Sequence, residues 1–312
     1  MAVLYAFYCL GFAAFNDFVF KLFARKPRSR GIFIFVVGVI MTAVQMVLLP
    51  NWRDTSSWKA TLLWGVICGF CSVVGNILLI ESMSRLSAGV CSTVYRLNLA
   101  LVIPLAVIFF HETPIWYQWF GVALALAAVL AFMPVGEQKS AGRKSDYAML
   151  ILAMMLRAGM GIAYKYAFKY AGAAESGVQI VNGLAWVVGG IVYYLLGERK
   201  TFACREAFSS KVLGYGAFSG VLVTGIIYFM AKSLAVGDAS IVLPIQQMSF
   251  LATFFLGVFF LKEKITIRKV AALVCGVAAL LLLSVKPKPA ASRPAKPASA
   301  VESAAKIEAE QP

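Results

Sequence analysis

Long apolar stretches follow one another along almost the whole chain, and short polar segments separate them. A helix that crosses the hydrocarbon core of a bilayer, about 30 Å thick, needs about 20 apolar residues. By that measure the sequence predicts ten membrane-spanning helices. They lie near residues 2–23, 31–50, 60–82, 87–110, 115–134, 147–170, 178–196, 211–233, 238–261 and 266–285. Turn-forming pairs such as Lys26-Pro27 and Thr113-Pro114 stand in the gaps between them.

Small and polar residues inside these spans recur in the second half of the chain at one constant offset. The aligned pairs are Gly65 with Gly216, Gly69 with Gly220, Ser82 with Ser233, Phe109 with Phe260, and Glu112 with Glu263. Each half holds five spans, an odd number, so the second half enters the membrane from the opposite side. We therefore predict an all-α integral membrane protein with ten transmembrane helices in two inverted five-helix repeats.

The repeat divides the chain into four parts. The first repeat covers residues 1–134, a polar linker 135–146, and the second repeat 147–285. Residues 286–312 are rich in Pro, Ala and Lys, which predicts a disordered tail.

The composition supports a lipid environment and excludes several other classes. The chain is 61% hydrophobic and 14% charged, whereas soluble domains carry about 25% charged residues. The formal net charge is +15, and the basic residues fall between the apolar spans and in the tail. Their placement indicates membrane topology rather than nucleic-acid binding. Cys68 and Cys71 form a C-x-x-C pair inside an apolar span, without a second pair or a neighbouring histidine. They are predicted to be buried thiols, and neither a metal nor another cofactor is expected.

The basic residues gather in alternate loops. Clusters such as Arg25-Lys26 and Arg143-Lys144 follow odd-numbered spans, whereas the loops after even-numbered spans carry only Arg53 and Lys59. Because cytoplasmic loops are enriched in Lys and Arg, both termini are predicted to be extracytoplasmic. A reporter that is active only in the cytoplasm, fused after Pro312, should therefore stay silent. A bright signal from that fusion would reverse the orientation.

Four ionisable residues lie deep inside predicted spans, where a charge costs about 2.5–3.5 kcal/mol on insertion scales. Arg96 lies near the centre of the fourth span and Arg157 near the centre of the sixth. Lys165 occupies the position in the sixth span that Asp17 holds in the first. The two arginines are candidates for binding an anionic solute, and Asp17 and Lys165 are candidates for coupling or gating. A structural ion pair between Arg96 and Asp17 is the alternative, as are bonds from Arg157 to helix backbones.

Neutral polar side chains form stripes at helical spacing in several spans and align between the two halves. Facing such groups to lipid would be costly, so they favour one shared cavity. Hydrogen bonds that join helices are the alternative. The predicted solute-binding residues are Asn76, Tyr95, Arg96, Asn98, Arg157, Asn182, Trp186, Tyr228 and Gln247.

The fourth span of each half is followed by a short acidic connection and a helix rich in small residues. These segments are Phe109-Phe-His-Glu112 before Trp119-Phe-Gly121, and Phe260-Leu-Lys-Glu263 before Val270-Ala-Ala272. With the ten-helix plan, they resemble the EamA-type transporters of the drug/metabolite transporter superfamily, from Met1 to about Val285. The resemblance implies a secondary transporter whose central cavity is lined by the first four helices of each half. Arg96-Leu97-Asn98-Leu99 stands where relatives often have a Leu-Asn-Pro-like stretch.

Signatures of an enzyme or of an ATP-driven pump are missing from the sequence. The chain has a single histidine, and no phosphate-binding Gly-x-x-x-x-Gly-Lys-Ser/Thr motif occurs. We therefore expect export or exchange of a small organic metabolite across the cell (inner) membrane. The cations of the deep spans favour an anionic or zwitterionic solute such as an amino acid or nucleotide sugar. The alternative is a non-transporting membrane scaffold or regulatory protein. The expected partners are the lipid bilayer and the solute, with a homodimer left open.

Overall fold

The computed structural model describes residues 1–24, 26–49, 57–86, 91, 94–131, 143–261 and 266–285. Every regular element in these ranges is helical. The longer helices are α1 (Ala2–Ala24), α2 (Arg30–Leu48), α3 (Trp58–Arg85), α7 (Lys144–Lys169), α8 (Glu175–Tyr193) and α10 (Ser210–Val236). The others are α5 (Leu99–Phe110), α6 (Trp116–Ala131), η2 (Tyr194–Glu198), α9 (Cys204–Ala207), α11 (Ala239–Gln247), α12 (Ser249–Leu261) and α13 (Ile267–Ser284). The predicted tail and most of the predicted linker lie outside the described residues.

The helices confirm the predicted multi-pass membrane architecture. Among the described residues, seven segments are long and apolar enough to cross a bilayer. Shorter apolar helices cover residues 94–110, 116–131 and 270–283, and with the seven they correspond to the ten predicted spans. The ninth span is divided at Met248, between α11 and α12, and Pro244 lies inside α11. Proline removes a backbone donor and weakens the helix around it.

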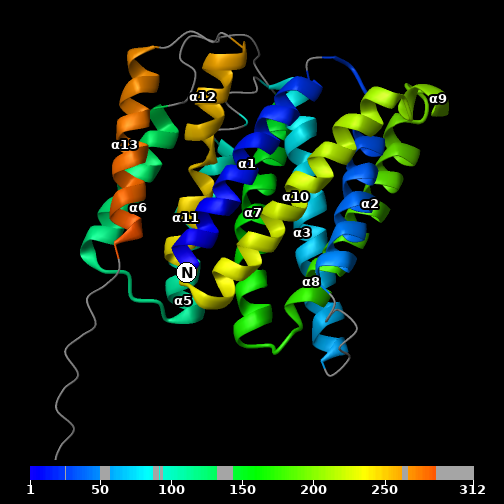
Figure 1. Cartoon of the computed structure of the whole chain (residues 1–312). Helices are drawn as coiled ribbons and strands as arrows, with labels where there is room; N and C mark the ends of the chain where they lie inside the picture. The colour runs from blue at the N-terminus through cyan, green and yellow to red at the C-terminus, as the bar shows by residue number, and fades with distance from the viewer. Residues whose placement is uncertain are drawn as a thin grey trace, which may run out of the picture.

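Consecutive spans run in opposite directions across the bundle (Figure 1). The start of α1 and the end of α13 lie on one face, here called the termini face. The opposite face, where α1 ends and α2 begins, is here called the basic face. The helices α6 and α13 pack together along one edge of the bundle. They are the fifth helices of the two halves, outside the eight helices that the family resemblance expects to line the cavity.

Helix contacts between the two halves follow the inverted repeat. The most extensive ones join α2 with α8, α1 with α10, α3 with α7, and α6 with α13. In both halves the G-x-x-x-G motif of the third span packs on the second span of the other half. A Cβ placed on Gly69 would lie 2.5 Å from Ala185 Cβ, and one on Gly220 would lie 2.7 Å from Ile40 Cβ. These glycines therefore let the helix backbones approach closely.

Large apolar side chains lie on the outside of the bundle as well as in its core. Leu63, Val188 and Phe218 are among the exposed ones. Such a surface would be unfavourable in water and suits the hydrocarbon region of a bilayer.

Candidate functional site

Arg96 connects the fourth span to the break in the ninth. Its Nη1 donates to the main-chain oxygen of Gln247 at 2.7 Å and to Ser249 Oγ at 2.9 Å. Its Nη2 forms an ion pair with the carboxylate of Asp17 on α1. The guanidinium side chain is 11% exposed and that of Asp17 36%. The structural ion pair that the sequence left open is therefore present, and it neutralises Arg96.

Arg157 has a different environment. Among the described residues, its only polar contact is a weak one from Nη1 to Met160 Sδ at 3.9 Å, and no carboxylate pairs with it. It interacts electrostatically with Tyr95 in the fourth span, Tyr164 on α7 and Cys9 on α1. Tyr95 also interacts with Arg96 and Asp17. Arg157 is thus a half-buried cation that lies among three helices without a counter-charge there.

A neighbouring layer of polar side chains joins α3, α7 and α8. Asn182 Nδ2 donates to the Tyr164 hydroxyl at 2.6 Å. Trp186 Nε1 donates to Ser72 Oγ at 2.9 Å, and both Asn182 and Trp186 are buried. Asn76 donates to the main-chain oxygen of Ser72 at 2.7 Å. In this conformation these predicted site residues make bonds within and between helices.

The remaining predicted residues are divided between the centre and the periphery. Asn98 is buried, and neither polar atom of its side chain has a hydrogen-bond partner in the described part of the chain. The side chain of Gln247 is buried beside the helix break. Tyr228 lies apart, against Phe229 and below Lys232. Arg96 thus binds Asp17 and the main chain of Gln247, Tyr95 interacts electrostatically with Asp17, Arg96 and Arg157, and the contacts of Tyr228 are with Phe229 and Lys232.

Lys165 lies in a second group, here called the Glu112 cluster, formed by the buried residues Glu112, Lys165, Ala239 and Ser240 and by the exposed Asp238. The Lys165 ammonium pairs with Glu112 and donates to the main-chain oxygen of Gly237 at 2.8 Å. Glu112 also accepts from the main-chain nitrogens of Ala239 and Ser240, both at 2.9 Å, and from Ser240 Oγ at 2.5 Å. Burial alone would raise the pKa of Glu112, but the hydrogen bonds from Lys165 and Ser240 hold that pKa below its ordinary value.

Glu112 is a residue that the list of predicted site residues missed. The available signal was its recurrence as Glu263 at the same place in the second half. The sequence could not show its partners, because the start of α11 comes close to it only through the tertiary packing of α5 against α11.

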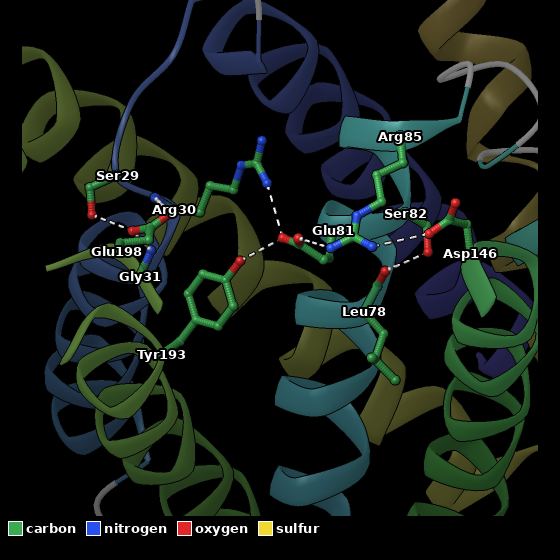
Figure 2. Close-up of polar contacts among 10 residues, drawn as sticks. All are labelled: Ser29, Arg30, Gly31, Leu78, Glu81, Ser82, Arg85, Asp146, Tyr193 and Glu198. Atoms are coloured by element: carbon green, nitrogen blue, oxygen red, sulfur yellow. Dashed lines mark hydrogen bonds and ion pairs between the residues drawn. The ribbon is translucent and has the colours of Figure 1, made fainter. Parts of the chain in front are cut away.

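A third polar group, here called the Glu81 network, joins the two halves near the basic face (Figure 2). Glu81 on α3 accepts from Arg30 at 3.2 Å, Arg85 at 3.1 Å and the Tyr193 hydroxyl at 2.7 Å. Arg85 extends the network to Asp146 on α7 at 3.2 Å. The network thus ties α2 and α3 of the first half to α7 and α8 of the second.

Glu198 caps the first turn of α2 beside this network (Figure 2). It accepts from Ser29 Oγ at 2.7 Å and from the main-chain nitrogens of Arg30 and Gly31 at 3.0 and 2.9 Å. A carboxylate at a helix N-terminus satisfies free amide groups and interacts favourably with the helix dipole. Within the described ranges, no cluster of His, Cys, Asp and Glu side chains could hold a metal ion.

Comparisons with known proteins agree with this architecture. A solved structure described as "Crystal structure of protein" matches with a TM-score of 0.73, over 91% of this chain and 96% of its own, at 13% identity. At that identity the match shows a shared fold alone. A comparison with curated proteins gives no match. The profile of the EamA-like transporter family matches residues 1–133 and 144–285, nearly the whole of both repeats. The chain therefore belongs to the EamA-like transporter family.

Proposed function

We propose that this transporter exports or exchanges a small organic anion or zwitterion, and that Arg157 binds its negatively charged group. The observation that carries the proposal is the guanidinium of Arg157, which has no carboxylate partner among the described residues. A cation deep in a membrane protein is costly unless an anion compensates it. A bound solute would supply that anion.

The charges at the centre of the bundle support this class of solute. Arg96 and Arg157 contribute two positive charges, and Asp17 compensates only Arg96. A carboxylate or phosphate accepts two parallel hydrogen bonds from a guanidinium. Tyr95 interacts electrostatically with both arginines, and its hydroxyl is proposed as a further contact of the same solute. The unsatisfied amide of Asn98, two residues from Arg96, is a further polar group for it.

The break in the ninth span supports a binding role for this region. The carbonyl of Gln247 at the end of α11 binds Arg96 instead of continuing a helix. Interrupted helices near the middle of the membrane supply such free backbone groups in many transporters. In the proposed site, Arg96 and Asp17 line the cavity as an ion pair, and Arg157 binds the negatively charged group of the solute.

The proposal includes placement in the cell (inner) membrane with both termini extracytoplasmic, and no enzymatic activity. The rival function is a membrane scaffold that moves no solute. A scaffold of that kind would not require a half-buried cation such as Arg157 without a carboxylate partner among the described residues.

Purified protein in liposomes provides the test. The liposomes would be preloaded with unlabelled glutamate, alanine or UDP-glucose, and entry of the same labelled compound would be followed. We expect exchange of at least one of these compounds and none of a monovalent organic cation used as the control. Exchange of the cation alone would contradict the solute class. Absence of exchange across a broad metabolite panel would favour the scaffold.

A further inference from the structure

We propose that Glu112 is a positioning residue that closes the transporter at the termini face, by holding Lys165 and the N-terminus of α11 against the end of α5. This inference rests on the transporter function shown by the family and not on the class of solute. Lys165 is one of the predicted coupling or gating residues, whereas no role was predicted for Glu112.

The local backbone places Glu112 at the point where three helices meet. α5 ends at His111, which adopts a left-handed conformation with φ 52° and ψ 34°. That conformation is unfavourable for most residues other than glycine, and it ends the helix abruptly. The next residue, Glu112, then contacts α7 through Lys165 and α11 through Ala239 and Ser240.

The contact is buried and rich in hydrogen bonds. The Lys165 side chain is 1% exposed and that of Glu112 3%. The carboxylate accepts from the ammonium, two main-chain nitrogens and one hydroxyl. The positive end of the α11 helix dipole adds to this attraction. The ammonium also lies 3.7 Å from Asp238 and 5.4 Å from the centre of the Phe110 ring.

The contact joins the two halves of the repeat. Glu112 follows α5 of the first half, whereas Lys165 and the start of α11 belong to the second half. α5 packs mainly on α11 and α7, so it cannot separate from them at the termini face while these bonds persist. A change of state in an inverted-repeat transporter moves the halves relative to one another, and opening at this face therefore requires Glu112 to release its partners.

The two halves differ in burial at matching positions, as expected for a one-sided state. Asp17 and Lys165 occupy equivalent places in the first and sixth spans. The side chain of Asp17 is 36% exposed, whereas that of Lys165 is 1% exposed. The repeat aligns these two positions, and in this conformation their surroundings differ. The structure is tightly sealed around Lys165 and looser around Asp17.

Spin labels on the termini face test the proposal without any solute. Cysteines at Thr113, beside Glu112, and at Val236, which is 64% exposed beside the α10–α11 connection, would carry them in a background without the native cysteines. Pulsed electron paramagnetic resonance in nanodiscs would give the distance distribution. We expect one short distance without further changes. Glu112→Gln should add a second population of molecules with a longer distance. The fraction of molecules in that population should be at least about tenfold larger than in the labelled protein that keeps Glu112.

A second variant covers the case in which Glu112→Gln fails to fold. Ala239 is the first residue of α11, where proline is tolerated. Asp238 already has the extended backbone that precedes proline, with φ −78° and ψ 132°. Ala239→Pro removes a main-chain donor to Glu112, so it should produce the same longer population.

The matched control is Glu175→Gln. Glu175 pairs with Lys232 at 3.3 Å near the termini face, but both residues belong to the second half. It should leave the distance distribution unchanged. The proposal is overturned if Glu112→Gln and Ala239→Pro keep the single short distance, or if Glu175→Gln lengthens it equally. A failed transport assay with lengthened distances would instead count against the solute class alone.

Discussion

Arg157→Gln is expected to weaken solute binding by about 10- to 100-fold while leaving the protein folded. A hydrogen bond to a charged group contributes about 1.5–3 kcal/mol, and each 1.4 kcal/mol is about tenfold in affinity. The variant removes this contact and does not break an ion pair, because Arg157 has no carboxylate partner among the described residues. The half-saturating concentration for exchange in liposomes measures the effect. Arg157→Lys should recover only part of it, because an ammonium cannot make the two parallel bonds of a guanidinium.

The control for this prediction is the other deep arginine. Arg96→Gln leaves Asp17 without its cation, so its defect should include lower stability, and adding Asp17→Asn should restore part of that stability. The assignment of Arg157 as the residue that binds the negatively charged group would fail if Arg157→Gln bound solute normally while the Arg96→Gln/Asp17→Asn pair lost binding. The anionic site would then centre on Arg96.

Lys165→Met is expected to lower the free energy of unfolding by about 3 kcal/mol, since removing one partner of a buried ion pair leaves the other charge uncompensated. Glu112 keeps its three donors from Ala239 and Ser240, which limits the loss. The double variant Glu112→Gln/Lys165→Met removes both charges and should recover a large part of it. Reversible unfolding in mixed detergent micelles measures these differences.

Lys232→Met supplies the comparison. Its pair with Glu175 is 37% and 23% exposed, and partly exposed ion pairs contribute at most about 1 kcal/mol. If Lys165→Met cost no more than Lys232→Met, the Lys165 pair would not behave as a buried one. The role of Glu112 in closing the termini face would then lose its energetic basis.

The architecture could be predicted because the membrane imposes it. Apolar length identified the spans, since every span must satisfy the same bilayer thickness. The G-x-x-x-G pairs were visible as repeats, and the structure shows each packed on the opposite half. The stripe of Asn182 and Trp186 was likewise visible from helical spacing. Its partners, Tyr164 and Ser72, were not visible, because spacing along one helix does not say which helix faces it.

The sequence alone determined the membrane environment, the ten spans, the inverted repeat and the presence of charges where lipid excludes them. Each of these follows from local composition or from a comparison of the chain with itself. Only the tertiary structure decided that Asp17 neutralises Arg96 while Arg157 is left without a carboxylate among the described residues. It also decided that Glu112 binds Lys165 and the start of α11. Charge pairing depends on a few ångströms between helices that are far apart in the chain, and packing sets those distances.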